Sequence, residues 1–343
     1  MLPLAPDPND EPPPEDVEEE LAAALPATQG RRFFPLMRQL VWHLVAFVLL
    51  GAAAYILWRE FHDISAAEVA SAIRAWGWDS IVIAICLSAS SFLIMGFVEW
   101  MGLRWAGAQV PLPRAMAGSF VASSIAHTLG ANLIVSGAVR ARFYARHGIT
   151  LRQVAAATLF HGFSFTVGIA TLAGLAFLLA GSRELTAVSR IPSSVADSAG
   201  VILIAGVLGY VVLCAVLHRP LRAFGHSVRL PSWRVAIAQI CIGATDNAVA
   251  AAILWILLPD GAISYFTFVG AYAPSVVVGL VSHVPGGMGV FEGSISTLIK
   301  SVQPAALAAA FLGYRVFFFL LPLLIGSLSL AVDTLREQAR ARR

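Results

Sequence analysis

The chain has 343 residues, of which 58% are hydrophobic and 13% are charged. Soluble domains carry about 25% charged residues, so this composition, with a mean hydropathy of +0.78, excludes a soluble globular protein and predicts several membrane spans. Arginine supplies every positive charge except Lys300. The three cysteines lie singly in apolar runs, which predicts neither disulfides nor a metal site: Cys86, Cys214 and Cys241.

The N-terminal residues 1–30 are rich in proline and acidic residues and offer few apolar groups to bury, which predicts a disordered tail. The first apolar run starts only after Arg31, Arg32 and Arg38, so we expect an uncleaved first span rather than a signal peptide. A transmembrane domain is predicted over residues 31–335, and a basic tail over 336–343.

Six runs with few or no charges are long enough to cross the hydrocarbon core as helices. They are residues 41–58, 79–101, 153–181, 198–218, 235–258 and 305–332. Residues 64–77 differ, because Ile64, Val69 and Ile73 recur at helical spacing among polar residues. This pattern predicts a short amphipathic helix at the membrane surface. The fold class is therefore all-α, a polytopic membrane protein.

Two further apolar regions, residues 115–139 and 262–299, decide the topology. If both are re-entrant and the N-terminus is cytoplasmic, 17 of the 23 basic residues lie inside and 5 outside, with Arg315 within a span. If both regions cross once, the count is 11 on each side. Because cytoplasmic loops are enriched in Lys and Arg, we predict six full spans, two re-entrant segments and two cytoplasmic termini. A region that crosses and returns would give the same count.

The two re-entrant segments then enter from opposite sides, which predicts an inverted repeat with halves of about 41–181 and 198–332. The halves align at a constant offset of 152 residues, which relates Gly137 to Gly289 and Phe165 to Phe317. Interrupted segments at matching places in two inverted halves are typical of transporters with a site near the bilayer midplane.

The second region is interrupted by the string His283-Val284-Pro285-Gly286-Gly287-Met288-Gly289-Val290-Phe291-Glu292. Proline lacks a backbone donor, and glycine permits sharp turns and close backbone contacts, so this string breaks a helix. An ionisable residue in apolar surroundings, here Glu292, is a functional candidate. The alternative is a surface loop in which Glu292 is solvated.

The first region contains the polar residues His127, Asn132, Ser136, Arg140 and Arg142. At the offset of 152 residues Arg140 corresponds to Glu292, so a base and an acid in the two breaks could bind a zwitterionic head group, or each other. Alternatively, the two arginines only hold their loop in the cytoplasm, and Asn132 and His127 only satisfy backbone groups freed at the break.

Two further charges, Asp246 and Arg315, lie about 15–17 Å deep in their predicted spans, near the midplane. Because a lone charge there costs several kcal/mol, we predict that they form an ion pair with a structural role. Tyr314 adds a hydrogen-bonding group beside Arg315. His161 is expected to be a core histidine, and Glu99, near a predicted helix end, to be neutralised by Arg104.

Enzyme signatures are missing from the sequence. It has no HExxH, Walker, GxGxxG or GxSxG motif, and no segment outside the predicted membrane domain is long enough to bind a nucleotide. We therefore expect no enzymatic activity, no cofactor, no metal and no nucleic-acid partner.

Three stretches resemble a known family. The string from Ser282 to Glu292, with Gly313-Tyr314-Arg315-Val316-Phe317-Phe318-Phe319-Leu320-Leu321-Pro322, resembles the end of the membrane domain of the lysylphosphatidylglycerol synthase/flippase family, also called multiple peptide resistance factor. Asn132 with residues 136–144 and 148–150 is similar to its first-half signature, and residues 245–259 also fit. The resemblance covers roughly residues 35–335.

In that family the membrane domain is implicated in moving aminoacylated phosphatidylglycerol between leaflets, and a separate soluble domain attaches the amino acid. The resemblance implies a lipid translocase of the bacterial inner membrane whose partners are membrane lipids. This chain ends at Arg343 without a synthase domain, so a separate lipid-modifying synthase is an expected partner and a lysylated substrate is not implied. The substrate-binding candidates are His127, Asn132, Ser136, Arg140, Arg142, His283, Gly286, Gly287, Glu292, Tyr314 and Arg315.

Two other functions stay open. One is a membrane-embedded lipid-modifying enzyme with Glu292 or His283 as general base, and the other is a scaffold that recruits lipid enzymes through its basic cytoplasmic face. A homo-oligomer is compatible with each of the three.

Overall fold

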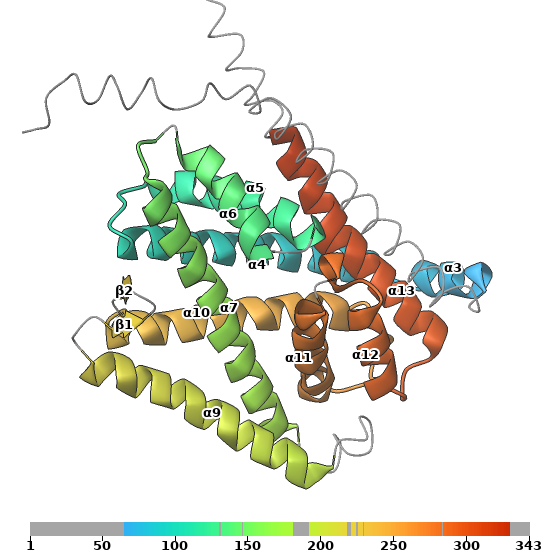
Figure 1. Ribbon diagram of the computed structural model, residues 1–343. Coiled ribbons are helices and arrows are strands. Elements are labelled where there is room, and N and C mark those ends of the chain that lie inside the picture. Colours follow the sequence, from blue (N-terminus) through green and yellow to red (C-terminus); the bar gives the residue numbers. More distant parts are fainter. Residues whose placement is uncertain are drawn as a thin grey trace, which may run out of the picture. The chain divides into compact units, whose positions relative to one another are not determined.

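The computed structural model describes residues 65–129, 132–145, 147–180, 192–217, 221–223, 226–228, 230–282 and 284–329 (Figure 1). Three predictions lie outside these residues: the tail 1–30, the first span 41–58 and the basic end 336–343.

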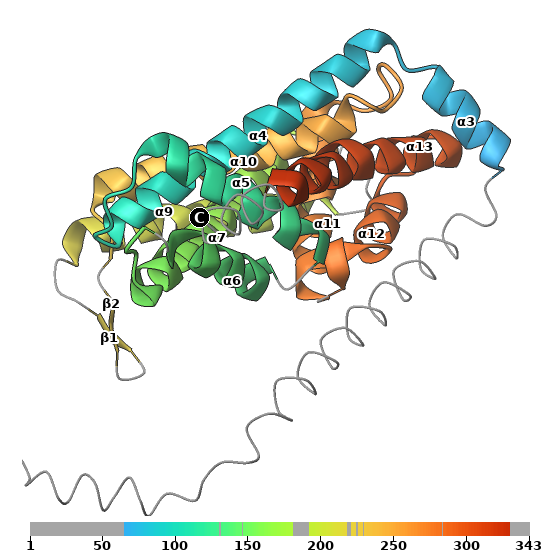
Figure 2. The same cartoon turned by 90° about the horizontal axis from the view of Figure 1, so that it is seen from above.

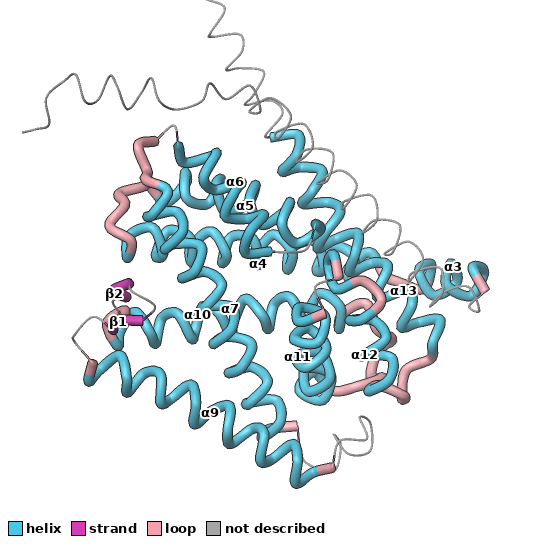
Figure 3. Tube along the Cα trace, viewed as in Figure 1, coloured by secondary structure: helices cyan, strands magenta, loops and turns pink. Residues whose placement is uncertain are grey.

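The described residues are almost entirely helical (Figures 1 and 3). The first half contains α3 (Ala66–Arg74), α4 (Trp78–Trp105), α5 (Leu112–Leu129), α6 (Asn132–Ala145) and α7 (Leu151–Leu179), and α9 (Ser193–Val216) follows. The second half contains α10 (Trp233–Trp255), α11 (Tyr265–Val281), the 3₁₀ turn η2 (Pro285–Gly287), α12 (Val290–Leu298), α13 (Pro304–Tyr314) and the π-helical turn η3 (Arg315–Leu320).

One small element departs from the predicted all-α fold. An antiparallel pair of three-residue strands, β1 (Leu221–Ala223) and β2 (His226–Val228), connects α9 to α10. It lies in the charged loop between two predicted spans, where apolar periodicity gives no signal.

Five described helices are long and apolar enough to cross a membrane: α4, α7, α9, α10 and the continuous segment Pro304–Ser329 that contains α13 and η3. They coincide with the five predicted spans that fall within the described residues. Large apolar side chains along α9 are exposed, among them Ile202 at 69% and Val216 at 71%. Such a surface is unfavourable in water and suits contact with lipid.

The predicted amphipathic segment also forms a helix, α3, with no buried residue of its own. The chain after it is anchored by Trp76, whose indole Nε1 donates to the Leu257 carbonyl at 3.1 Å. A Cβ added to Gly313 would lie 2.7 Å from the Trp76 ring, so this glycine makes room for the indole against α13.

Helix starts follow local sequence. Thr150 and Gln153 form a reciprocal capping box at the start of α7, and the side chains of Ser232 and Ser264 accept from the third residue of α10 and α11. These hydroxyls satisfy backbone donors that have no partner within the first helical turn.

The same order of elements occurs twice: a long helix, a helix that breaks and resumes, and a second long helix. In the first half these are α4, α5 with α6, and α7; in the second they are α10, α11 with α12, and α13. Val281, which ends α11, lies 152 positions after Leu129, which ends α5, and Pro304 lies 153 positions after Leu151. The order of elements thus repeats at close to the predicted offset, and the inverted orientation of the two halves stays a prediction.

Helices α7 and α10 cross in direct backbone contact between the two halves. A Cβ on Gly168 would lie 2.3 Å from the Gly243 carbonyl carbon, and a Cβ on Gly243 would lie 2.2 Å from the Ser164 oxygen. Figures 1 and 2 show α10 continuing from this crossing past α4 and α11. The largest core cluster lies where α10 packs against α4 and α11. Its aromatic members include Phe268, Tyr272, Phe291, Phe311 and Phe318.

Candidate functional site

The second helix break lies against the C-terminal end of α5. Gly286, in the η2 turn, is so close to the end of α5 that an added Cβ would lie 3.5 Å from the His127 carbonyl oxygen and 3.7 Å from that of Thr128. The same Cβ would lie 3.2 Å from Nη1 of Arg315. We call this meeting point of α5, η2 and η3 the junction.

The glycines of the second break adopt the turn that the sequence predicts. Gly286, Gly287 and Gly289 have φ angles of 59°, 61° and 79°, a left-handed conformation that glycine tolerates and side chains disfavour. At Gly287 an added Cβ would also lie 3.3 Å from the Gly279 Cα, so the turn packs directly on the backbone of α11.

Glu292 and Arg315 form the ion pair that holds this turn. Arg315 Nε donates to Glu292 Oε1 at 2.8 Å, and Nη2 donates to the same oxygen at 2.5 Å. Its Nη1 donates to the Gly286 carbonyl at 2.8 Å. The other carboxylate oxygen of Glu292 accepts the Gly289 N–H at 2.8 Å, which caps α12. The Arg315 side chain is 12% exposed and that of Glu292 is 8% exposed.

The predicted ion pair between Asp246 and Arg315 is therefore wrong. Asp246 Oδ1 accepts instead a hydrogen bond of 2.6 Å from Ser91 Oγ on α4. Arg315 opens a π-helical turn, and its guanidinium faces the break and α12. Counting along a helix gives the depth of a charge but not the side of the helix on which it lies.

Aromatic rings join the two breaks at the junction. The Arg315 guanidinium carbon lies 4.6 Å from the Phe319 ring centre, and the His127 ring centre lies 6.3 Å from the same centre. His127 Nδ1 is buried and has no hydrogen-bond partner in the part of the chain that the structure describes. Tyr314 is buried beside them, with its hydroxyl 3.0 Å from that of Tyr272.

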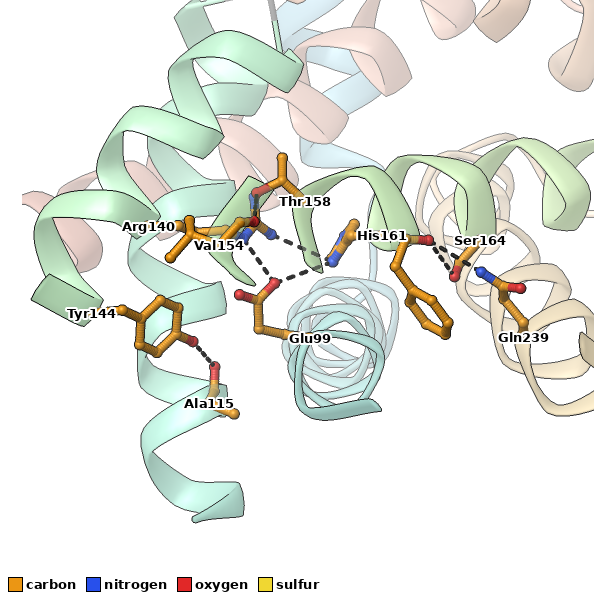
Figure 4. A network of polar contacts seen from close by, with 10 residues as sticks. Glu99, Ala115, Arg140, Tyr144, Val154, Thr158, His161, Ser164 and Gln239 are labelled. Atoms are coloured by element: carbon orange, nitrogen blue, oxygen red, sulfur yellow. Dashed lines mark hydrogen bonds and ion pairs between the residues drawn. The ribbon is translucent and has the colours of Figure 1, made fainter. Parts of the chain in front are cut away.

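Arg140, the counterpart of Glu292, is buried in a cluster of its own (Figure 4). Its Nε donates to Glu99 Oε2 at 2.7 Å, and its Nη2 lies 3.4 Å from His161 Nδ1. His161 Nδ1 is 3.6 Å from the same Glu99 oxygen. Arg140 thus binds Glu99 rather than Glu292. The Arg140 side chain is 2% exposed and that of Glu99 is fully buried. An arginine that only held its loop in the cytoplasm would be exposed, so the burial of Arg140 argues against that alternative.

Glu99 and His161 were not predicted as partners of Arg140. The sequence predicts that Glu99 lies near a helix end, but α4 continues to Trp105 and Glu99 is buried within it. The predicted partner Arg104 is exposed, and its guanidinium carbon lies 4.8 Å from the Trp100 ring centre. Glu99 pairs with Arg140 instead. The signal available in the sequence was the presence of a lone acid and a lone histidine in two apolar helices that flank the first break.

The remaining substrate-binding candidates differ in their exposure. Ser136 is buried on α6, whereas Arg142 is exposed on the same helix. Asn132 begins α6, but its side chain, like all of His283, lies outside the described residues.

Comparison with known proteins gives the family of the chain. A family described as "Lysylphosphatidylglycerol synthase TM region" matches residues 42–326. The chain belongs to this family. Together with the five long apolar helices, the match makes the chain a multi-pass membrane protein.

Two relatives are each 28% identical to the chain. One, over 316 residues, is the uncharacterized protein slr0712 of Synechocystis sp. (strain ATCC 27184 / PCC 6803 / Kazusa), with 87% of this chain and 95% of the relative aligned. The other, over 284 residues, is the inner membrane protein YbhN of Escherichia coli (strain K12), with 80% and 87% aligned.

In this member of the family a groove of about 510 Å³ opens between α11 and α12, beside the helix start that carries Glu292. Small and apolar side chains line it: Pro274, Ser275, Val278, Gly289, Val290, Gly293, Ser294, Thr297 and Leu298. Among the described residues, no three His, Cys, Asp or Glu side chains are close enough together to hold a metal ion. The chemistry available at the junction is charge pairing and hydrogen bonding.

Proposed function

We propose that the protein is a lipid translocase, in which the head group of a phospholipid passes the junction between the two helix breaks. The observation that carries this proposal is the meeting of the breaks at a buried Glu292–Arg315 pair in a membrane domain of this family. Broken helices at membrane depth are tolerated where they line a cavity or are buried in protein, and in transporters they form the substrate site.

The Glu292–Arg315 pair suits a substrate with both phosphate and ammonium groups. Without a substrate the two charges neutralise each other, which offsets the cost of burying them. A zwitterionic head group can exchange partners with this pair: its phosphate accepts from the planar guanidinium of Arg315, and its ammonium donates to Glu292. Both charges stay paired throughout the exchange.

The groove between α11 and α12 supports a path for the rest of the lipid. It lies beside Glu292 along α12, which Gly289 caps, and its lining is mostly apolar with a few hydroxyl groups. In the proposed path the acyl chains stay in this groove and in the surrounding lipid while the head group crosses at the junction.

We propose six full crossings and two segments that return to the side they entered. Helix α12, with 9 residues, is about 14 Å long, and α6, with 14 residues, is about 21 Å long. Both are shorter than a hydrocarbon core of about 30 Å, which favours helical hairpins that dip and return. By analogy with the inner membrane protein YbhN of Escherichia coli, we place the chain in the bacterial cytoplasmic membrane.

Reconstitution tests the proposal. The purified protein is placed in liposomes that carry phosphatidylglycerol, phosphatidylethanolamine or lysyl-phosphatidylglycerol with a fluorescent label, and dithionite reports the label that reaches the outer leaflet. We expect the wild-type protein to move at least one of these lipids, and Glu292→Gln and Arg315→Gln to lose most of that movement. The matched controls are Glu68→Gln and Arg234→Gln, since both of these charges are exposed.

The controls should move lipid at the wild-type rate. Gel filtration and circular dichroism must show that all variants are folded. Lipid movement no faster than in protein-free liposomes, or a folded Glu292→Gln variant with the wild-type rate, would contradict the proposal.

A further inference from the structure

Among the described residues, the carboxyl groups of the membrane helices include these three: Glu99 on α4, Glu292 in the first turn of α12 and Asp246 in the middle of α10. Two of them are neutralised by arginine, Glu99 by Arg140 and Glu292 by Arg315. Asp246 differs, because within the described residues its side chain has a hydrogen bond from the neutral Ser91 hydroxyl and no salt bridge.

Several charged and titratable groups on the helices that pack against α10 are bound to partners other than Asp246. On α7, His161 contacts Glu99 and Arg140, and on α9 the Tyr210 hydroxyl donates to Gln239. On α11, Tyr265 donates to the Ala248 carbonyl, while Tyr272 pairs with Tyr314 of α13. Arg315 is bound to Glu292 and Gly286. On α4, Ser91 faces Asp246, and Glu99 is bound to Arg140.

A carboxylate with only a hydroxyl partner is costly in these surroundings. Burying an ion without a counter-charge costs far more than burying the neutral acid, so such a group tends to bind a proton instead. Glu99 and Glu292 offset this cost through their ion pairs with Arg140 and Arg315. Asp246 has no arginine partner among the described residues, and binding a proton would remove this cost. A group that is neutralised by a proton can also release it.

The contacts of Asp246 lead to the junction. Ser91 shares the buried face of α4 with Ser88, whose hydroxyl donates to the Phe317 carbonyl at 2.8 Å within the π-helical turn η3. A charge that appears on Asp246 therefore acts on the turn that positions the Arg315 guanidinium.

We propose that Asp246 is a proton-binding site and that its proton couples lipid movement at the junction to the proton gradient across the membrane. The coupling rests on the proposed lipid translocation, whereas the proton site does not. In the protonated state Arg315 stays with Glu292. When the proton leaves, the new charge acts through Ser91, Ser88 and the η3 turn on the position of Arg315, which weakens its pairing with Glu292 and opens the pair to a head group.

Infrared spectroscopy tests the proton site without any transport assay. The wild-type protein in lipid vesicles at neutral pH should show a carboxylic-acid C=O band that shifts in D₂O. This band should be lost in Asp246→Asn and kept in Glu292→Gln and in Asp260→Asn, a control in an exposed loop. Absence of the band from the wild-type protein, or its persistence in Asp246→Asn, would overturn the proton site.

A gradient experiment tests the coupling. Lipid movement is measured in proteoliposomes with and without an imposed pH gradient. The wild-type protein and Asp246→Glu should respond to the gradient, whereas Asp246→Asn should lose the response. A wild-type rate that ignores the gradient, or an Asp246→Asn variant that still responds, would overturn the coupling alone. If the wild-type protein moves no lipid, the coupling fails together with the proposed function, and the infrared band still decides the proton site.

Discussion

Arg140 and Glu292 occupy equivalent positions in the two halves but carry opposite charges. Each is neutralised within its own half: Arg140 by Glu99 on the long helix before it, and Glu292 by Arg315 on the long helix after it. Each pair ties the second part of a broken helix to a long neighbouring helix. Because both charges sit among apolar side chains, loss of either partner leaves the other unpaired at high cost.

A double-mutant cycle at Glu292 and Arg315 measures how strongly the pair couples. Glu292→Gln and Arg315→Gln should each destabilise the protein by about 3–5 kcal/mol, because each leaves a buried charge without its partner. The double variant should lose less than the sum of the two, since no charge is left unpaired. Thermal unfolding in detergent gives the comparison.

Arg234→Gln provides the control for this cycle. Its side chain is exposed at the start of α10, so the change should alter stability by about 0.5 kcal/mol or less. Strictly additive losses in the cycle would mean that Glu292 and Arg315 do not interact in solution.

The sequence could identify residues with buried charges but not their partners. Glu292, Arg140 and Arg315 stand out as ionisable groups in apolar runs. Asp246 and Arg315 were matched because they have similar depth, yet pairing also depends on helix rotation and on the path of the broken segment, which hydropathy does not report. The Gly286 carbonyl and the π-helical turn together direct Arg315 towards Glu292.

At the level of the elements, close helix contact depends on a few glycines. Gly168 and Gly243 let α7 and α10 touch through their backbones, whereas Gly209 on α9 has open space where its Cβ would be. Helix positions followed readily from apolar run lengths. The contact between α7 and α10 did not, because glycine is common in membrane helices and its position alone does not name a partner.

Alanine substitutions should separate these two kinds of glycine. Gly168→Ala places a methyl group 2.3 Å from the Gly243 carbonyl carbon, so the helices must move apart and stability should fall by about 1–3 kcal/mol. Gly209→Ala meets no atom within 4 Å and should be neutral or stabilise α9 by up to about 1 kcal/mol. Thermal unfolding of both variants in the same detergent makes the comparison, and equal effects would contradict direct contact between α7 and α10.

At the level of the whole molecule, the two halves repeat one order of elements with two breaks that meet. The repeat was predictable because an offset of 152 residues relates the breaks as well as several identities. The contact of Gly286 with the end of α5 was not, since it depends on how the halves pack together. The proposed inverted arrangement would allow this contact, because segments that enter from opposite sides and end at the same depth can touch at their tips.

Accessibility of single cysteines tests this inverted arrangement. The positions are chosen at the ends of the two broken segments: Gln109 and Arg152 flank α5 and α6, and Asp260 and Ser301 flank α11 and α12, all four exposed. A background without Cys86, Cys214 and Cys241 carries one new cysteine at a time. In the proposed topology each dip returns to the side it entered. Gln109→Cys and Arg152→Cys should then react with a membrane-impermeant maleimide from one side, and Asp260→Cys and Ser301→Cys from the other. The distribution of basic residues predicts that the first pair is cytoplasmic.

Labelling of Gln109→Cys and Arg152→Cys from opposite sides would mean that the first region crosses the membrane once and would remove the inverted repeat.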